Sequence, residues 1–267
     1  MKIIGLLSDF GLRDSYVAEM KAVVLSICPE ARLVDISHEI KKFDVRMGAF
    51  VLASAAKSFP EGSIYLAVVD PGVGSERRPL IVQSNKSLYV GPDNGLLMLS
   101  AIRERLQCVY CIKDQKYLRD AVSATFHGRD VFARVVGDLA NGVSPPNIGS
   151  EVKDYVKPEY CRPTVNSDSI DCEVLHVDDF GNIVTNVDAS SIVKSNLNLE
   201  SALSLTVGRK LLRLVFARTY NEIPKGALGC LVGSHGFLEI AMRMRDASKV
   251  VRVTQGSKLK IRVSDPI

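Results

Sequence analysis

Acidic and histidine side chains stand where predicted strands of this chain end. Asp9 follows the apolar run 2–7, Asp70 follows the run 64–69, and His127 comes just before a predicted helix. Open α/β sheets bind ligands at the carboxyl ends of their strands, so these positions are candidates for a functional site. Two chemistries suit such a set, namely hydrolysis with divalent metal ions and the binding of a nucleoside.

The most informative stretch surrounds Asp70, where the run 64–69 stops. Residues 71–74, Pro-Gly-Val-Gly, force a tight loop, and Arg77 and Arg78 follow it. Taken alone, the pattern fits a plain turn with two solvated arginines as well as it fits a site. The other acids and histidines on the same predicted edge favour the functional interpretation.

Metal hydrolysis is the less favoured chemistry. His38 in the segment Asp-Ile-Ser-His is a candidate ligand, but the chain has no His-x-x-x-His or Asp-x-Asp motif, and a loop histidine can simply bond to backbone. Cys108 and Cys111 have the CxxC spacing, yet they lie in a predicted strand that sends the two thiols to opposite faces. We expect no metal site.

A nucleoside suits the residues better. A strand-end carboxylate binds ribose hydroxyls in dinucleotide folds, and Asp9 is the natural candidate for that contact. The GxGxxG fingerprint is absent, so we do not expect a dinucleotide-type phosphate loop.

Alternating strands and helices must position these residues. Apolar strand patterns alternate with helical patterns as far as residue 139, and Asp14 and Asp44 are the expected caps of the first two helices. This order predicts an α/β domain over residues 1–163, with a mostly parallel sheet and helices on both faces.

The pattern changes after the proline-containing segment 144–163. Seven short strands with turn signals between them are expected over residues 172–177, 183–187, 202–207, 211–217, 227–232, 237–241 and 258–263. Residues 168–267 should therefore form a small all-β domain, either a barrel or a sandwich.

Composition limits the class of protein. The 267 residues are 46% hydrophobic, which supports buried cores. The net charge of +4 comes from 34 basic and 30 acidic residues mixed along the chain, so we do not expect nucleic acid as a partner. We also expect no membrane span and no signal peptide, and six scattered cysteines are typical of reduced thiols in a cytoplasmic protein.

Several motifs, taken together and in order, are similar to those of one family. They are Ser-Asp-Phe-Gly at 8–11, Val-Asp-Ile-Ser-His at 34–38, Val-Asp-Pro-Gly-Val-Gly at 69–74, Pro-Asp-Asn-Gly at 92–95, Thr-Phe-His-Gly-Arg-Asp at 125–130, Asp-Asp-Phe-Gly-Asn at 178–182, Thr-Asn at 185–186 and Gly-Ser-His-Gly at 233–236. The chain resembles the S-adenosylmethionine (SAM) hydroxide adenosyltransferases, which are related to fluorinating and chlorinating enzymes.

The resemblance implies a Rossmann-like first domain, a β-barrel second domain and a homotrimer with sites between one subunit's first domain and its neighbour's second. It also implies that water or hydroxide displaces methionine at ribose C5′, giving adenosine and L-methionine without a cofactor. The family's catalytic trio falls on Asp70, Arg77 and His127, with Arg78 as the alternative to Arg77.

Substrate contacts are expected from both domains. Asp9 is assigned to the ribose, Phe43 to the sugar or methionine side, and Asp178 and Asn182 to the methionine ammonium and carboxylate. The remaining assigned contacts are Phe180, Tyr220 and Ser234 around adenine, together with Asn94 and His235. For the two aromatics the alternative is a place in the barrel core.

A difference from the halide-using relatives and one departure from the family pattern bear on this assignment. Asp70 and Gly128 stand where the halide-using relatives carry Tyr and Ser, which argues against halogenation. The usual Asn-Ser pair appears as Gly233 and Ser234, so a base contact from the Asn side chain is lost. The alternatives are a chlorinase-like halide-using transferase, a metal-dependent hydrolase and a non-catalytic nucleoside-binding protein.

Histidine alone cannot activate the water. Proton transfer from water, with a pKa of ~15.7, to imidazole, at ~6.5, costs about 12 kcal/mol at roughly 1.36 kcal/mol per unit. A cation such as Arg77 would stabilise developing hydroxide, while Asp70 orients Arg77 or His127. The sulfonium leaves as a neutral thioether and needs no acid, so attack can be concerted with proton loss.

Overall fold

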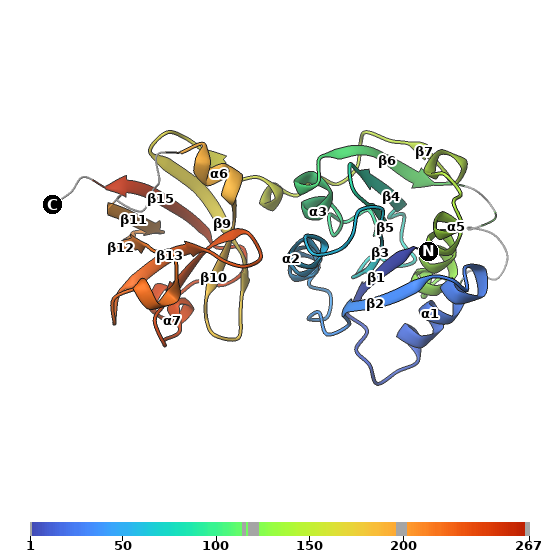
Figure 1. Ribbon diagram of the computed structural model, residues 1–267, viewed down its shortest axis with the longest axis horizontal. Helices are drawn as coiled ribbons and strands as arrows, with labels where there is room; N and C mark the ends of the chain where they lie inside the picture. Colours follow the sequence, from blue (N-terminus) through green and yellow to red (C-terminus); the bar gives the residue numbers. More distant parts are fainter. Residues whose placement is uncertain (1, 114–115, 117–122, 196–201, 265–267) are drawn as a thin grey trace. The chain divides into compact units, whose positions relative to one another are not determined.

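Two sheets organise the chain, one in each of two units (Figure 1). The computed structural model describes residues 2–113, 116, 123–195 and 202–264. The units are Met1–Pro158 and Glu159–Ile267, so the chain divides a few residues before the expected end of the first domain at residue 163. Short 3₁₀ turns lie at Pro145–Asn147, Glu159–Cys161 and Tyr220–Glu222.

The first unit is built on a sheet with the strand order β2-β1-β3-β5-β4-β6-β7. Its strands are β1 (Ile3–Ser8), β2 (Arg32–Ser37), β3 (Ile64–Val68), β4 (Pro79–Ser84), β5 (Leu88–Pro92), β6 (Leu106–Ile112) and β7 (Gly149–Glu151). The first four in this order pair in parallel, whereas β4 runs antiparallel to both β5 and β6. Within the described residues five of the seven strands thus share one direction, since β7 is antiparallel to β6, and the expected mostly parallel sheet is confirmed.

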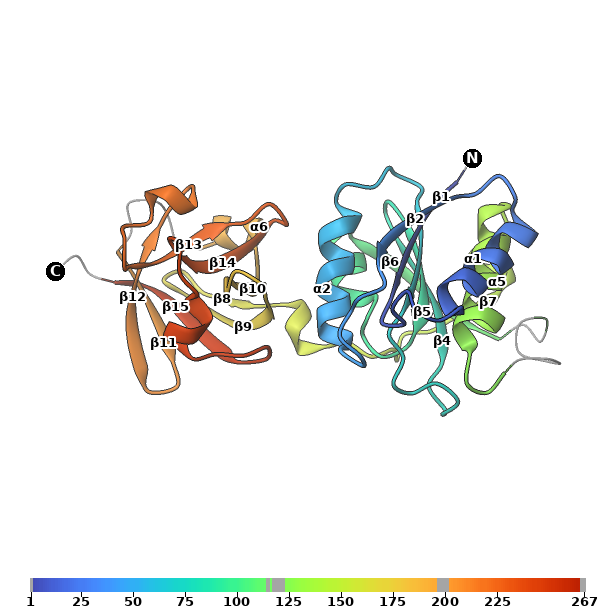
Figure 2. The same ribbon diagram turned by 90° about the horizontal axis from the view of Figure 1, so that it is seen from below.

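Helices cover both faces of this sheet. Figure 2 shows α2 (Val45–Ala56) on one side, and α1 (Tyr16–Ile27) and α5 (Ala133–Ala140) on the other. The short α3 (Met98–Arg103) packs beside α2. No helix in the described ranges is long and apolar enough to cross a lipid bilayer.

Local signals explain the helix ends. Asp44 caps α2 as expected, because its Oδ1 accepts a hydrogen bond from the backbone of Met47 at 2.9 Å. The expected cap at Asp14 is wrong. Ser15 holds the N-cap position of α1, and its Oγ donates to Glu19 at 2.6 Å instead of capping the backbone.

The helix expected after His127 begins as a π-helical segment over Gly128–Phe132 that continues into α5. His127 is therefore the residue that precedes this helix. Strand β6 confirms the prediction for the CxxC pair: Cys108 packs against the core on the α1 and α5 side, Cys111 is not part of that core, and both thiols are free.

The second unit is a closed barrel with the order β10-β14-β13-β12-β11-β15-β9, in which β9 pairs back with β10. Its strands are β9 (Ser169–Val177), β10 (Ile183–Asp188), β11 (Ala202–Val207), β12 (Lys210–Phe216), β13 (Leu228–Val232), β14 (Phe237–Met242) and β15 (Lys258–Ser264), with β8 (Thr164–Val165) beside β9. Two short helices, α6 (Ala189–Val193) and α7 (Ala247–Val251), accompany them. Apolar residues such as Leu203, Leu205 and Ile240 fill its core. Because the pairing of β9 with β10 closes the sheet, the expected barrel is confirmed and the sandwich is wrong.

Candidate active site

Asp70, Arg77 and His127 form one connected cluster at the end of β3. Arg77 Nε donates to Asp70 Oδ1 at 3.0 Å, and Nη2 donates to Asp70 Oδ2. The same Nη2 lies 3.0 Å from His127 Nδ1, and the guanidinium carbon lies 5.1 Å from the ring centre of Phe132. The side chains of Arg77 and Asp70 are only 8% and 5% exposed, so their charges interact with little solvent screening.

The loop after Asp70 brings the arginine back. Gly74 has a φ of +77°, and a Cβ there would lie 2.6 Å from the carbonyl oxygen of Ala124. Only glycine permits this close approach. The loop therefore lies directly against the segment that leads into His127, which is how residues 50 positions apart in the sequence meet.

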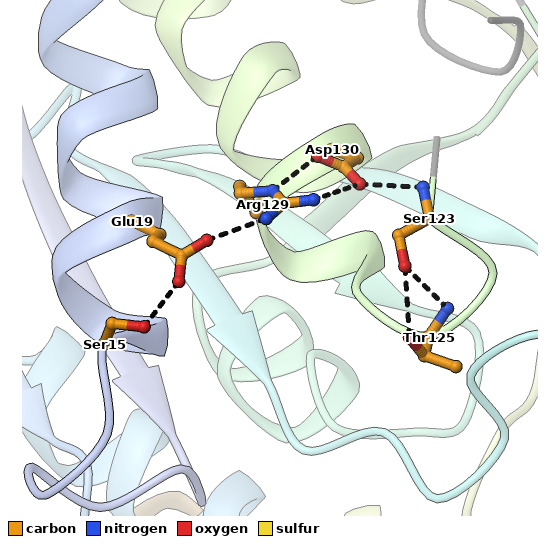
Figure 3. A network of polar contacts seen from close by, with 6 residues as sticks. All are labelled: Ser15, Glu19, Ser123, Thr125, Arg129 and Asp130. Carbon is orange, nitrogen blue, oxygen red and sulfur yellow. Dashed lines mark hydrogen bonds and ion pairs between the residues drawn. The ribbon is translucent and has the colours of Figure 1, made fainter. Parts of the chain in front are cut away.

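A second polar network holds the start of the helix after His127 (Figure 3). Arg129 bridges two carboxylates, with Nε 2.7 Å from Asp130 Oδ1 and Nη1 2.7 Å from Glu19 Oε2. Asp130 Oδ2 also accepts from the backbone of Ser123 at 2.8 Å. These contacts tie α1, the π-helical segment and residue 123 together and so fix the backbone next to His127.

The hydrogen bonds determine the tautomer of His127. An arginine nitrogen can only donate, so Nδ1 of the neutral imidazole is the acceptor and Nε2 carries the proton. Burial, and next the charge of Arg77, lower the pKa of His127 from its ordinary value of 6.5, against the opposing effect of Asp70 and Asp130. His127 is therefore neutral at pH 7 and offers an N–H donor.

Arg77 keeps one nitrogen without a partner. Its Nη1 is buried and makes no hydrogen bond to any residue that the structure describes. A buried donor without an acceptor is unfavourable unless a ligand satisfies it. Together with Nε2–H of His127, this nitrogen gives the cluster two donors, which suits an oxygen that carries or develops negative charge.

Arg78, the alternative to Arg77, is engaged elsewhere. Its Nε and Nη2 donate to Asp93 Oδ2 at 3.0 and 2.7 Å, and its Nη1 donates to Asp154 Oδ1 at 2.9 Å. These contacts pin β4 to the end of β5 and to the segment near residue 154. The residue that joins Asp70 and His127 is Arg77.

The other candidates of the first unit lie in two groups. Asp9 is buried, and its Oδ2 accepts from the backbone of Phe43 at 2.8 Å, so the structure brings this pair together. Phe43 has a φ of +66° and an exposed ring. Asn94 instead bonds within the sheet edge: its Nδ2 donates to the carbonyl oxygen of Val69 at 2.8 Å, and its Oδ1 accepts from the backbone of Leu96 at 3.1 Å.

No metal centre emerges in the described part of the chain. His38 is buried between Ser8 Oγ, 2.7 Å from its Nδ1, and Asp35 Oδ1, 3.1 Å from its Nε2. Both ring nitrogens are thus used in the fold. Over the described ranges no three His, Cys, Asp or Glu side chains gather as metal ligands would.

A pocket of about 710 Å³ in the barrel unit gathers four of the predicted substrate contacts. It is lined by Asp178, Phe180, Asn182, Tyr220, Met242, Met244, Arg245 and Asp246. Phe180 and Tyr220 are 81% and 46% exposed, so their placement in the barrel core, the alternative considered above, is wrong. The last four residues were not expected, because nothing in their spacing marks the turn after β14 as part of a site.

A hydrogen-bonded turn presents the polar side of this pocket. Asp178 Oδ1 accepts from the backbones of Phe180 and Asn182 at 3.0 and 2.8 Å. Its Oδ2 accepts from Asn182 Nδ2 at 3.0 Å. The structure therefore brings Asp178 and Asn182 together, and the turn leaves the ring of Phe180 exposed.

Glu239 is a buried carboxylate that the sequence reasoning missed. It is 2% exposed, accepts from the hydroxyl of Tyr220 through Oε1, and lies 2.9 Å from His235 Nε2 through Oε2. Burial, and next the bond to Glu239, raise the pKa of Tyr220. The sequence signal that could have revealed it is an acidic residue within the otherwise apolar strand β14.

The same pair explains the glycine at position 233. A Cβ on Gly233 would lie 2.5 Å from Glu239 Oε2 and 2.5 Å from His235 Nε2. The His235–Glu239 pair thus fills the space that a side chain would need. The glycine at position 233 therefore goes with a hydrogen bond between His235 and Glu239 that links the loop to Tyr220.

The chain is similar to known proteins over most of its length. The family model described as SAM hydroxide adenosyltransferase N-terminal domain matches residues 4–149, and the model for the C-terminal domain matches residues 172–260. A protein of Salinispora arenicola named (R)-S-adenosyl-L-methionine hydrolase is 36% identical, with 97% of each chain covered.

A protein of the same name from Methanocaldococcus jannaschii is 34% identical, with 98% of this chain and 96% of the relative covered. Among solved structures, an uncharacterized conserved protein from Thermotoga maritima superposes with a TM-score of 0.85 at 34% identity. That match covers 97% of this chain and 99% of the other. Both the sequence and the two-unit architecture are therefore shared over nearly the full length.

Proposed function

This chain belongs to the SAM hydroxide adenosyltransferase family, and from that premise we propose that it hydrolyses S-adenosyl-L-methionine to adenosine and L-methionine. The observation that carries the proposal is the Asp70–Arg77–His127 cluster with its buried, unpartnered Nη1. A guanidinium nitrogen in this state suits a hydroxide, or a water that is becoming one.

In the proposed reaction an oxygen–C5′ bond forms while the C5′–S bond breaks. The bonding electron pair goes to sulfur, and the sulfonium becomes the neutral thioether of methionine. When the nucleophile is water, its proton passes to solvent in the same step. No cofactor is required.

Each member of the cluster has a distinct proposed role. Asp70 orients the guanidinium through two hydrogen bonds. Arg77 stabilises the negative charge on the attacking oxygen. His127 acts as a hydrogen-bond donor to that oxygen rather than as its base, because its Nδ1 already accepts from Arg77. Positioning the oxygen in line with C5′ removes part of the entropic cost of the attack.

The substrate contacts are proposed to come from both units. Asp9 binds the ribose hydroxyls and Phe43 covers the sugar. The pocket of the barrel unit, with Asp178, Phe180 and Tyr220, encloses the adenine and methionyl parts.

The family's homotrimer, with sites completed by neighbouring subunits, is part of the proposal. Large apolar side chains are exposed at the candidate residues, with Phe43 69% and Met244 93% exposed, as expected of surfaces that contact another molecule. A cytoplasmic location is also proposed, supported by six free cysteines.

Mixing two inactive variants tests the assembly. In co-refolded mixtures of Arg77→Ala and Tyr220→Ala subunits, sites shared between neighbours should regain about a quarter of the wild-type activity, since each site draws its two halves from different subunits of a closed ring. No recovery in a mixture that sedimentation shows to be co-assembled would contradict shared sites.

The test of the reaction is incubation with SAM, with and without chloride, followed by chromatography for adenosine, methionine and 5′-chloro-5′-deoxyadenosine. Both epimers at sulfur are assayed, since the relatives' names specify (R). We expect adenosine and methionine in equal amounts and no chlorinated product. Absence of all three products refutes the hydrolase, and binding of SAM without turnover favours a nucleoside-binding protein.

A halide-using transferase is disfavoured by the space around residue 128. A Cβ on Gly128 would lie 3.1 Å from Met20 Sδ and 3.2 Å from Phe126 Cε2. The serine that the halide-using relatives carry beside the halide would therefore be crowded here.

A further inference from the structure

The direction of the His127 side chain depends on its backbone. Its imidazole makes one hydrogen bond with the residues that the structure describes, at Nδ1, where Arg77 Nη2 lies 3.0 Å away. One contact fixes one point of the ring, and the terminal torsion of a histidine has only broad energy minima. The direction of Nε2–H, the group proposed to meet the attacking oxygen, is therefore set by the turn that follows His127.

Helix α1 supports this turn at two neighbouring positions. A Cβ on Gly128 would lie 3.1 Å from Met20 Sδ, so the backbone next to His127 packs directly on α1. Arg129 Nη1 donates to Glu19 Oε2 at 2.7 Å, and Figure 3 shows Glu19 reaching from α1 towards Arg129. The two residues after His127 thus meet two successive residues of one helix.

Both ends of the Arg129 bridge are oriented by further hydrogen bonds. On α1, Ser15 Oγ donates to Glu19 Oε1 at 2.6 Å. This bond, and next the bond from Arg129, lower the pKa of Glu19, so the carboxylate is ionised at pH 7. On the turn, Arg129 Nε and Nη2 donate to Asp130 Oδ1 and Oδ2 at 2.7 and 3.0 Å. Three guanidinium nitrogens are thus engaged, which a lysine cannot reproduce.

The turn itself is of a kind that needs such support. Gly128–Phe132 is π-helical, with the backbone N–H of Ala133 bonded to the carbonyl oxygen of Gly128 five residues earlier. Single π-helical turns are rare and frequently lie at functional sites. Here the turn places His127 at the start of the helix, within reach of Arg77. Losing the contact with α1 would allow the turn to move, and His127 with it.

We propose that Glu19 and Arg129 are positioning residues for the hydrolysis, because their ion pair ties the turn after His127 to α1 and thereby directs Nε2–H at the attacking oxygen. In this role neither side chain touches the substrate or the nucleophile. The inference rests on the proposed hydrolase function, in which His127 donates to that oxygen. Misplacing a group by about 1 Å can cost about 10²-fold in rate, so loss of the pair should lower kcat and leave substrate binding intact.

The test compares Glu19→Ala, which removes the carboxylate, with Glu19→Gln, which keeps an oxygen that accepts from Arg129. Steady-state rates of adenosine formation should show a kcat about 10- to 100-fold lower in Glu19→Ala, with the KM for SAM within about twofold of the wild type. Glu19→Gln should regain most of the rate, because the hydrogen bond remains. A role in stability alone would not separate kcat from KM in this way.

Lys21→Ala is the matched control on the same helix. Lys21 Nζ lies 2.6 Å from Asp35 Oδ2, and these side chains are 30% and 42% exposed, against 35% and 34% for Glu19 and Arg129. Both alanine variants therefore lose one half-exposed ion pair of α1 and should unfold at similar urea concentrations. Lys21→Ala should keep kcat within about twofold. Equal losses of kcat in the two variants would overturn the role of the Glu19–Arg129 pair.

Nuclear magnetic resonance reads the position of His127 without turnover. The chain has four histidines, and the imidazole signal of His127 is the one lost in His127→Gln. Glu19→Ala should shift this signal. Lys21→Ala should leave it unchanged and shift the signal of His38, whose Nε2 lies 3.1 Å from Asp35 Oδ1.

The outcomes separate the positioning role from the reaction. An unshifted His127 signal or a wild-type kcat in Glu19→Ala overturns the positioning role and leaves the hydrolase intact. A wild-type protein that does not turn over SAM refutes the hydrolase. In that case the His127 signal alone decides whether the pair positions this side chain.

Discussion

Replacing Arg77 with lysine keeps the positive charge of the cluster and removes the fork that joins Asp70 to His127. An ammonium group can approach either partner, but it cannot reproduce the two bonds to Asp70, the contact with His127 and the free Nη1 together. The stacking of the guanidinium over Phe132 is lost as well.

The expected effects follow from burial. Because both side chains are over nine-tenths buried, weakening this pair should lower the free energy of unfolding by about 2 to 4 kcal/mol. Removing one donor from a developing oxyanion typically reduces kcat by about 10²- to 10³-fold. The KM for SAM should change only a few-fold, since the guanidinium is proposed to contact the nucleophile and not the adenosyl group.

The assay is initial-rate formation of adenosine by chromatography, with urea unfolding of the same preparations. Arg78→Lys is the matched control, an identical change at the neighbouring position, where the side chain is 31% exposed and pairs with Asp93 and Asp154. We expect the control to keep kcat within about threefold, because Arg78 bonds to Asp93 and Asp154 and not to Asp70 or His127.

Two results would refute the reasoning. One is an Arg77→Lys protein that retains more than half of the wild-type kcat, which would remove the fork from the mechanism. The other is an equal loss in Arg78→Lys, which would mean that the activity depends on the stability of this loop and not on the donors of Arg77.

Three further predictions concern other parts of the molecule. The folded state lowers the pKa of His127 from 6.5, so on acidification the imidazole of the unfolded chain is protonated first, and the free energy of unfolding should fall as the pH drops from about 6.5 towards the lower native pKa. Urea titrations at several pH values should show a weaker dependence of this free energy on pH in His127→Gln. An unchanged dependence would contradict the assignment. Gly233→Ala should displace the buried pair of Glu239 and His235 and lower the free energy of unfolding by about 2 to 3 kcal/mol, with a raised KM for SAM; wild-type stability would show that the loop adapts freely. Incubation with EDTA should leave adenosine formation unchanged, whereas a loss that Mg²⁺, Mn²⁺ or Zn²⁺ restores would support the metal-hydrolase alternative.

Periodic patterns gave most of the fold correctly because they act over short distances along the chain. The apolar runs at 64–69 and 237–241 are strands, and the seven expected strands of the second unit are all present. The cap at Asp44 was predictable for the same reason. The cap expected at Asp14 failed because Ser15 holds that position and its hydroxyl bonds to Glu19.

Such patterns do not predict which residues far apart in the sequence come into contact. Whether Arg77 or Arg78 meets Asp70 depends on how the loop after β3 returns, and the tautomer of His127 depends on an arginine 50 residues away. Glu239 went unnoticed because its significance lies in its two partners, Tyr220 and His235, which are distant or unremarkable in the sequence pattern.

The sequence by itself thus determined the two kinds of domain, the acid at the end of β3 and, through ordered motifs, the family. The tertiary structure decided which arginine completes the cluster, which nitrogen of His127 carries the proton, and which donor remains unpartnered. The reason is physical: strands and helices follow from side chains a few positions apart, whereas charge, burial and hydrogen bonding in a site are set by groups that only folding brings within 3 Å of one another.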